Sequence, residues 1–389
     1  MNGDGVIEEN VAQQETHDTQ NTHTPQAIYH DSSQYRHWRF SAEELHEKRA
    51  AANGKAVAVT RAGWDEEKEL NPESSLSTSI TPPSVQEEDD LIVYYLSQIR
   101  PICNLFQFPE NVEATAMTYM KRVYLANSVV DLHPKRVMLT SLFLATKTVN
   151  TPISAADFAK YVGKGKISAE SILDIEFLIS QNLRFEFATH PAHRAAWGIY
   201  LDMQTMASRQ SQQVLDGVYA EVRQLIRVSR LTYAELIYSP SQIALGCFSM
   251  VNKGLLDEYV GWKKTEFGAE EPNANAVEGV VNLINIHKSR GGLKKEAVQD
   301  IDKRLKLWQD PSKVEGTAMY KKKQEQAEQE DYEKRAKRQL EVERSNYDGE
   351  SVFGEALPAL KRSRTNEGVE EEQEQEQEQN GSQQVKQEI

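Results

Sequence analysis

Few residues of this chain have the types and spacing needed for chemistry, and phosphate binding is the first possibility to consider. The run Gly163-Lys164-Gly165-Lys166 combines two glycines with two lysines, a composition that can surround phosphate groups. Its spacing is not that of a P-loop, and no strand is expected before it, so it is interpreted as a turn between helices. The glycine-rich loop and the His-Arg-Asp and Asp-Phe-Gly triplets of protein kinases are absent from the sequence.

Histidine and cysteine offer neither a metal site nor a nucleophile. His190 and His193 are close in sequence, but Pro191 lies between them and no carboxylate or cysteine cluster accompanies them, which indicates a helix start. Cys103 and Cys247 each lie alone in an apolar stretch, without the electropositive surroundings that activate a thiol. With Gly-x-Ser-x-Gly also absent, we expect a protein that is not an enzyme, holds no cofactor or metal, and works by binding.

Composition and charge narrow the class of protein further. The chain has 389 residues, enough for two or three domains, and its 45 Lys and Arg against 59 Asp and Glu give a net charge of −14. This balance argues against a protein whose whole surface binds nucleic acid. Isolated cysteines, the lack of a long apolar run and an N-terminus unlike a signal peptide predict a soluble protein of a reducing compartment, without a transmembrane helix.

The two ends of the chain differ in composition from its middle. Residues 1–27 are polar and without periodicity, and residues 346–389 are basic and then strongly acidic, so both are predicted to be disordered. Residues 291–345 are dense in charge and are expected to form C-terminal charged helices or a disordered segment. Three residues of the tail are candidates for a nuclear import signal: Lys361, Arg362 and Arg364.

Residues 28–86 are interpreted as an N-terminal helix followed by a linker. The helix is expected to begin at a capping box formed by Ser41 and Glu44, where each residue bonds to the backbone of the other. It is expected to continue to about Ala52 and to end at Asn53-Gly54. Prolines and small hydroxyl residues fill the rest of this stretch and predict the linker.

From residue 87 to about residue 310, apolar residues recur with the period of amphipathic helices, and no stretch has the period of a strand. The helices expected in the first half are 87–100, 110–127, 134–148, 154–161 and 168–183. Those expected in the second half are 191–206, 210–229, 240–253, 255–261, 275–289 and one from about 296. The pattern predicts an all-α protein.

The two halves of this helical region resemble each other. Each contains a short helix that starts with proline and is apolar nearly all round, at Pro134 in the first half and at Pro240 in the second, about 106 residues apart. A helix of this kind belongs in the middle of a bundle. The sequence therefore predicts two helical domains in tandem, at 87–188 and 189–290, although two unrelated buried helices would look the same.

Three motifs in these halves resemble the cyclin box. They are the run Tyr119 to Val129 (YMKRVYLANSV), the run His133 to Lys147 that contains MLTSLFLATK, and the run Tyr238 to Leu245 (YSPSQIAL). The resemblance covers about residues 28–310 and implies two tandem five-helix cyclin-box domains with flanking N- and C-terminal helices and disordered tails. Its most specific part is the N-terminal run Tyr29 to Ser41, which is similar to the cyclin H branch of the family.

This resemblance implies a regulatory subunit rather than a catalyst. A protein of this branch binds a cyclin-dependent kinase of the CDK-activating type and activates it allosterically, together with a third assembly subunit and TFIIH. The implied targets are the C-terminal tail of RNA polymerase II and the activation loops of other cyclin-dependent kinases, and the implied location is the nucleus. Neither direct nucleic-acid binding nor a membrane is expected.

The resemblance also implies site residues. In cyclins a Lys at the end of the central helix and a Glu in the fifth helix bind the regulatory helix of the kinase, and here they correspond to Lys147 and Glu176. An ammonium group can donate to helix carbonyls, and a carboxylate can accept from backbone amides. Further apolar kinase contacts are implied at Leu144 and Phe185, and contacts of the N-terminal helix with the boxes at Trp38 and Phe40.

One position departs from the family pattern, and two other interpretations stay open. Lys121 stands where many cyclins carry an Asp that pairs with an Arg of the first helix, so that ion pair is expected to be absent or reversed. A cyclin of the cyclin C branch is the nearer alternative. The other is a TFIIB-like tandem helical protein that binds DNA through basic residues within 286–306, which a steep salt dependence of DNA binding would favour.

Overall fold

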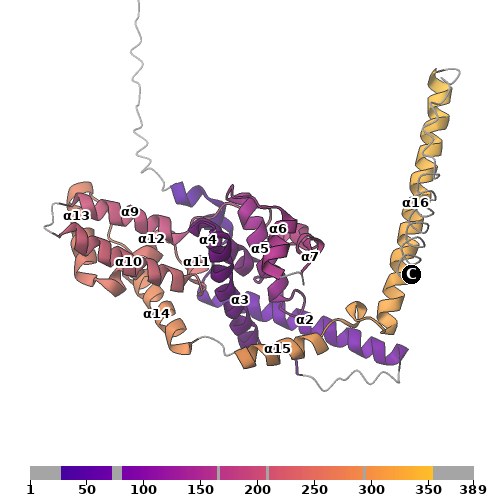
Figure 1. Ribbon diagram of the computed structural model, residues 1–389, viewed down its shortest axis with the longest axis horizontal. Helices are drawn as coiled ribbons and strands as arrows, with labels where there is room; N and C mark the ends of the chain where they lie inside the picture. The colour runs from indigo at the N-terminus through magenta and orange to yellow at the C-terminus, as the bar shows by residue number, and fades with distance from the viewer. Residues whose placement is uncertain (1–27, 72–80, 164–166, 207–209, 292–294, 354–389) are drawn as a thin grey trace, which may run out of the picture. The chain divides into compact units, whose positions relative to one another are not determined.

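The computed structural model describes residues 28–71, 81–163, 167–206, 210–291 and 295–353, and every regular element in these ranges is a helix (Figure 1). The prediction of an all-α protein is therefore confirmed. The chain forms two compact units, of which the first ends at Tyr320 and the second begins at Lys321. No helix in the described ranges is both long enough and apolar enough to cross a membrane. The predicted import residues Lys361, Arg362 and Arg364 lie outside the described residues.

The chain enters the fold through a short 3₁₀-helix (Ile28–Asp31), helix α1 (Ser33–His37) and the long helix α2 (Ala42–Leu70). The capping box of Ser41 and Glu44 is present at the start of α2. The predicted end of this helix at Asn53-Gly54 is wrong, because α2 continues through both residues. Asn53 donates from its side chain to the carbonyl of Pro83 at 3.0 Å, and tertiary packing of Ala52 and Ala56 offsets the helix cost of Gly54.

The first helical bundle is built around α5 (Pro134–Thr148). This helix is buried on nearly every side, as its apolar sequence predicts, and it starts with Pro134 at a position that needs no amide donor. It packs against α3, α4, α7 and α8. The surrounding helices are α3 (Val85–Phe106), α4 (Glu110–Val123), α6 (Ala155–Gly163), α7 (Ala169–Leu173) and α8 (Glu176–Asn182).

The second bundle repeats this plan around α12 (Pro240–Val251), which packs against its five neighbours. Gly246 permits the close approach of α14, because a Cβ atom there would lie 2.7 Å from Cγ1 of Val280. The neighbouring helices are α9 (Ala192–Thr205), α10 (Gln212–Ser229), α11 (Ala234–Ile237), α13 (Lys253–Phe267) and α14 (Ala274–Arg290).

The helix predicted over residues 168–183 is two helices in the structure. Helix α7 ends at Leu173, and α8 begins at Glu176. The break follows from a tertiary contact: Thr140 of α5 donates its hydroxyl to the carbonyl of Ile172 at 2.9 Å. In a continuous helix that carbonyl would accept from the amide of Glu176. The break therefore places Glu176 in the first turn of a helix instead of in the middle of one.

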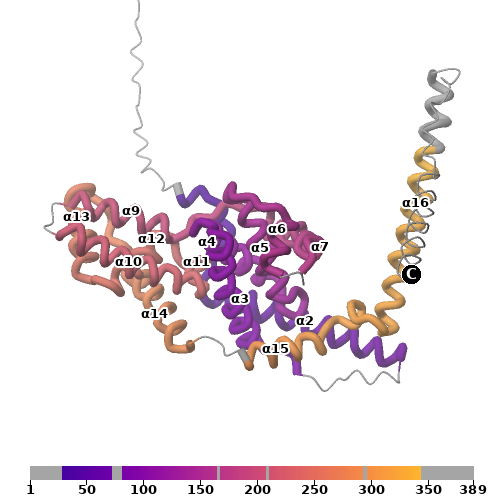
Figure 2. The backbone as a smooth tube through the Cα atoms, in the orientation of Figure 1, coloured from indigo at the N-terminus to yellow at the C-terminus, as the bar shows by residue number. Residues whose placement is uncertain are grey.

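The residues after α14 contribute more to the hydrophobic core than their high charge content predicted. Helix α15 (Lys295–Leu307) packs against α3 (Figure 2). Its Val298, Ile301 and Leu305 join the core of the first bundle. After a 3₁₀ turn (Pro311–Lys313), α16 runs from Ala318 to Phe353, so its backbone is helical into the stretch predicted to be disordered. Glu67 of α2 accepts from the amides of Ala318 and Met319, both at 2.9 Å, and so caps the first turn of α16.

The two bundles meet at a polar seam built around Lys121. This lysine is almost completely buried, and its ammonium contacts Glu235 at 2.7 Å and the carbonyls of Arg230 at 2.8 Å and Thr232 at 2.9 Å. Burial lowers the pKa of Lys121, and Glu235 opposes that effect. Within the described ranges no ion pair joins α3 to α4, because Lys121 instead pairs with the second bundle.

A second cluster on the same seam centres on Glu110. This carboxylate contacts Arg223 at 2.9 Å and Arg230 at 2.8 Å. Burial alone would raise the pKa of Glu110, but the arginines, Arg230 foremost, lower it to about 2. Arg230 also donates to Nδ1 of His193 at 3.0 Å. Burial, and then the charge of Arg230, lower the pKa of His193 to about 4, so its imidazole is neutral near pH 7.

Candidate functional site

Helices α5 and α8 bring Lys147 and Glu176 together at the surface. Nζ of Lys147 lies 2.6 Å from Oε1 of Glu176, and the lysine side chain is 42% exposed. Lys147 is in the last turn of α5 and Glu176 is the first residue of α8, so each charge lies at the helix end whose dipole it complements. Two residues far apart in sequence are thus held in one exposed, preformed pair.

Apolar surface surrounds this pair. The ammonium of Lys147 lies 4.4 Å from the ring centroid of Phe143, a cation–π contact that fixes the lysine side chain. Phe177 and Phe185 are 65% and 55% exposed, and their ring centroids lie 6.2 Å apart. Phe187 follows, with its ring centroid 6.3 Å from that of Phe185. Large exposed aromatic residues beside a charged pair are typical of a protein-binding surface.

Phe177 was not predicted at this surface, and Leu144, which was, is buried. Phe177 follows Glu176 directly, and its exposure depends on the break between α7 and α8. Leu144 was expected to contact a partner, but it is only 5% exposed and packs within the core of the first bundle. Neighbouring helices surround α5 as far as its last turn. The side chain of Leu144 therefore lies beneath the surface around Lys147 and Glu176.

The N-terminal residues Trp38 and Phe40 join the two bundles. Trp38 is 4% exposed and donates from Nε1 to Oε2 of Glu186 at 2.6 Å, directly after the first bundle. Phe40 is partly buried, and its amide donates to the carbonyl of Leu236 in α11 at 2.8 Å. Trp38, Leu45, Leu125 and Leu236 form one small apolar cluster. The N-terminal segment is therefore packed against both halves of the fold.

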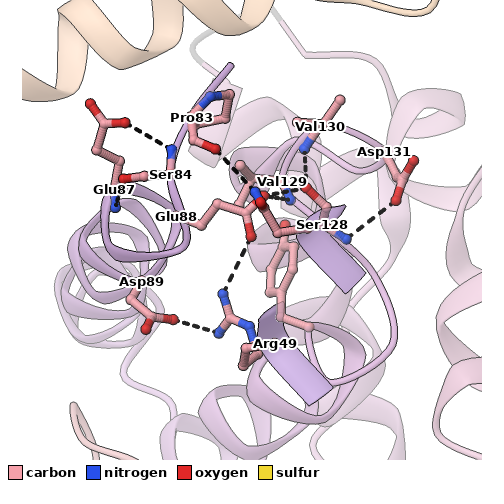
Figure 3. Close-up of polar contacts among 12 residues, drawn as sticks. Arg49, Pro83, Ser84, Glu87, Glu88, Asp89, Ser128, Val129, Val130 and Asp131 are labelled. Carbon is pink, nitrogen blue, oxygen red and sulfur yellow. Dashed lines mark hydrogen bonds and ion pairs between the residues drawn. The ribbon is translucent and has the colours of Figure 1, made fainter. Parts of the chain in front are cut away.

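Buried charges tie α2 to the first bundle, as Figure 3 shows. Arg49 of α2 pairs with Asp89 at 2.7 Å and lies 3.6 Å from Glu88, both in α3. Glu88 also accepts from the hydroxyl of Ser128 and, at 3.2 Å, from the amide of Val129. Burial raises the pKa of Glu88 despite these partners. No local pattern predicts this network, because its partners come from three separate segments.

The cysteines and histidines considered for catalysis or metal binding are not arranged for either role in the described part of the chain. Cys103 and Cys247 are free and buried, and burial raises the pKa of both thiols to about 12, so neither is an activated nucleophile. In the described part of the chain, no three His, Cys, Asp or Glu side chains gather as a metal site would require. His190 and His193 flank the start of α9, as predicted. Lys164, Gly165 and Lys166 lie outside the described residues.

The basic stretch within 286–306 does not form one uniform positive face. Arg304 is paired with Glu87 and lies 3.2 Å from Asp300. His287 lies in α14, whereas Lys303 and Lys306 lie in α15, a separate helix that packs on the first bundle. No observation on these residues favours DNA binding. The exposed Lys147–Glu176 pair and the aromatic residues beside it instead favour a protein-binding surface.

Two tandem helical bundles with an exposed charged pair beside aromatic residues define a protein that acts by binding another protein. Family models identify which kind. The "Cyclin, N-terminal domain" model matches residues 67–188, and the "Cyclin C-terminal domain" model matches residues 190–288. This chain belongs to the cyclin family, whose members are regulatory, non-catalytic subunits of kinases. The predicted family and the tandem cyclin-box fold are confirmed.

Relatives with curated names narrow the branch of the family. Cyclin mcs2 of Schizosaccharomyces pombe is 30% identical over 80% of this chain and 94% of its own length. Cyclin CCL1 of Saccharomyces cerevisiae is 30% identical over 65% of this chain and 64% of that protein. Cyclin-H of Xenopus laevis is 34% identical over 56% of this chain and 66% of that protein. The chain thus spans slightly less than two thirds of two of these relatives and nearly all of the third.

Solved structures agree with this grouping. A chain of the yeast TFIIK complex of Kin28, Ccl1 and Tfb3 matches with a TM-score of 0.51 and 26% identity, over 67% of this chain and 99% of that chain. A chain of the CAK complex of Chaetomium thermophilum matches with a TM-score of 0.61 and 24% identity, over 77% of this chain and 94% of that chain, which shows a shared fold. Neither comparison favours the cyclin C or TFIIB-like alternatives.

Proposed function

We propose that this cyclin binds a cyclin-dependent kinase of the CDK-activating type and activates it allosterically. The observation that carries the proposal is the exposed Lys147–Glu176 pair, at 2.6 Å, beside the exposed rings of Phe177 and Phe185. The relatives support the choice of kinase, since one solved neighbour is a TFIIK complex and another is a CAK complex. The cyclin itself supplies no catalytic group.

The Lys147–Glu176 pair is suited to hold a helix of the kinase. An ammonium has three donors, and among the described residues Glu176 is the only hydrogen-bond acceptor that Lys147 contacts. The remaining donors can meet backbone carbonyls of a docked helix, and the second oxygen of Glu176 can accept from backbone amides. Phe177 and Phe185 would bury their exposed rings against apolar residues of the same helix.

Activation then follows from differential binding. A cyclin-dependent kinase requires its regulatory helix in a position that completes the catalytic Lys–Glu pair. A rigid partner that binds this active arrangement more tightly than the inactive one shifts the population toward it. A change from mostly inactive to mostly active kinase needs about 5 kcal/mol of differential binding. A two-bundle surface with one charged pair removed from water can provide a free energy of this size.

The setting of this activity follows from the relatives' complexes. The solved TFIIK neighbour contains a kinase, a cyclin and a third protein, Tfb3. By analogy this chain would assemble with a kinase, a third assembly subunit and TFIIH in the nucleus. Its kinase would phosphorylate the C-terminal tail of RNA polymerase II and the activation loops of other cyclin-dependent kinases.

The test is to co-express the full chain with a panel of cyclin-dependent kinases and to assay each purified pair on the RNA polymerase II tail. Activation of the CDK-activating kinase, and its loss in Glu176→Ala, would support the proposal. The matched control is Glu271→Ala, because Glu271 pairs with Lys264 at the same 2.6 Å but lies on the second bundle. A folded chain that activates no kinase of the panel would contradict the proposal.

A further inference from the structure

The turn that follows α8 has an unfavourable backbone conformation. Arg184 and Phe185 have φ values of 55° and 58°, in the left-handed region that non-glycine residues rarely adopt. The amide of Phe185 donates to the carbonyl of Ser180 at 2.9 Å, which closes the end of the helix. A glycine would occupy such a turn without steric cost, whereas an arginine and a phenylalanine do so only where surrounding contacts hold them.

The contacts that hold this turn come from the N-terminal segment and from α4. Oε2 of Glu186 accepts from Nε1 of Trp38, and Oε1 of Glu186 lies 2.6 Å from Nδ1 of His37. On the other side, Arg122 of α4 donates to the carbonyl of Glu186 at 3.1 Å. The hydroxyl of Tyr119, also in α4, donates to the carbonyl of Phe187 at 2.7 Å. The two residues that follow Phe185 are therefore held by residues from outside the turn.

Trp38 is the centre of this arrangement. Two guanidinium groups contact its ring, with that of Arg122 4.7 Å and that of Arg184 5.6 Å from the ring centroid. Both are cation–π contacts, and Arg184 is one of the two residues with the unfavourable backbone. A single N-terminal residue thus holds the side chain of Arg184 and the carboxylate of Glu186, immediately before and after Phe185.

We propose that Trp38 and Glu186 are positioning residues for kinase binding. They hold the 184–187 turn in its left-handed conformation, and this conformation directs Phe185 toward the kinase together with Phe177 and the Lys147–Glu176 pair. Neither Trp38, which is buried, nor Glu186 needs to touch the kinase. The inference rests on the proposed function, because it assigns Phe185 to the kinase-binding surface.

The experiment is a double-mutant cycle on the full chain, with affinity for the kinase that it activates as the measured quantity. Trp38→Phe keeps an aromatic ring beside Arg122 and Arg184 but removes the N–H donor, and Phe185→Ala removes the ring that the turn presents. We expect each single change to weaken binding about tenfold. The double variant should be no weaker than Phe185→Ala alone, because Trp38 acts through Phe185. Trp197→Phe is the control, since Trp197 is an exposed tryptophan of the second bundle.

Amide hydrogen exchange provides the second measurement. In Trp38→Phe the amides of Phe185 and Glu186, which bond to Ser180 and Leu183, should exchange faster, while those of α5 keep their protection. Multiplicative losses of affinity in the double variant, or unchanged exchange in the turn, would overturn the inference. If Glu176→Ala also left kinase binding intact, the proposed function itself would fail. Loss with Glu176→Ala but independent effects of Trp38 and Phe185 would overturn the positioning role alone.

Discussion

Lys121–Glu235 and Lys147–Glu176 are Lys–Glu pairs of nearly equal length in opposite surroundings. In the seam between the bundles, Lys121 lies 2.7 Å from Glu235 and is 1% exposed. At the end of α5, Lys147 lies 2.6 Å from Glu176 and is 42% exposed. Besides this ion pair, the ammonium of Lys121 donates to two backbone carbonyls. Among the described residues, Glu176 is the only acceptor for Lys147.

This difference separates a pair that holds the fold together from a pair available to a partner. A buried ion is tolerated only when it is paired and hydrogen-bonded, as at Lys121. An exposed pair contributes little to stability because water competes for both groups. Under the proposed function, the contribution of the Lys147–Glu176 pair would appear when the kinase excludes that water. Chemical identity of the residues alone does not distinguish the two roles.

The largest expected effect is at the seam. Glu235→Ala leaves the ammonium of Lys121 buried without its counter-ion, so the free energy of unfolding should fall by about 3–5 kcal/mol. The corresponding change at the surface, Glu176→Ala, should alter it by less than about 1 kcal/mol. Urea denaturation of both variants measures the contrast. Equal losses of stability would contradict the separation of roles.

The second prediction concerns affinity for the kinase, for which Glu176 should matter more than Glu235. Glu176→Ala should weaken the kinase complex by about 2–5 kcal/mol, because Lys147 then loses its partner in an interface without water. Titration of the kinase with each purified variant gives the affinity. Glu271→Ala, at an exposed pair with the same 2.6 Å distance, should bind as the unaltered chain does. A similar loss in both variants would argue against a specific role for Glu176.

The third prediction concerns pH and tests the seam alone. The pKa of His193 is lowered to about 4 by burial and by Arg230, so below about pH 6.5 the unfolded chain binds a proton that the folded chain does not. Stability should therefore decline between pH 6.5 and pH 4, by roughly 2 kcal/mol once partial solvent access is allowed for.

Urea midpoints at pH 7.5 and 4.5 measure this decline, and His193→Gln should reduce it. The groups that face His193 are Arg230, Glu110, Arg194 and Arg223. Glu110 does not account for the decline at the start of this window. Its pKa is lowered to about 2, so the stability that it contributes is lost only as the pH falls from about 4.5 to 2. An identical decline in the variant and the unaltered chain would exclude His193 as the cause.

The smallest expected effect is a gain in stability without a change in kinase affinity. Gly54 lies inside α2, and a Cβ atom there would meet nothing within 4 Å. Gly54→Ala should therefore raise the free energy of unfolding by about 1 kcal/mol, since alanine favours the helix more. Kinase affinity should not change. Weaker binding of this more stable variant would show that the interface depends on the flexibility of α2.

Helices could be predicted from the sequence where their own residues decide them. The apolar pattern and proline start of α5 and α12 located both central helices, and the Ser41–Glu44 box located the start of α2. The predictions failed where a residue from a distant segment determines whether a helix continues. Asn53-Gly54 does not end α2, because Asn53 bonds to Pro83.

The candidate site was also predicted only in part, because some of its features depend on residues from distant segments. Lys147 and Glu176 could be named through the motifs that resemble the cyclin box, and the structure brings them together at the surface. Phe177 was missed and Leu144 was expected to be accessible, because exposure depends on how α5, α7 and α8 pack rather than on residue type. The contacts of Trp38 with Glu186 join residues 148 positions apart, beyond the reach of any local pattern.

Local patterns in the chain predict that this protein is helical and that its helical region is built twice. Periodicity and proline position are local properties of the sequence. Folding determines that Lys121 is buried while Lys147 is exposed, where the helix predicted over 168–183 breaks, and that Trp38 of the N-terminal segment contacts Arg184 and Glu186 beside Phe185. Burial and hydrogen-bond completion depend on residues from distant segments, and these meet only when the chain is folded.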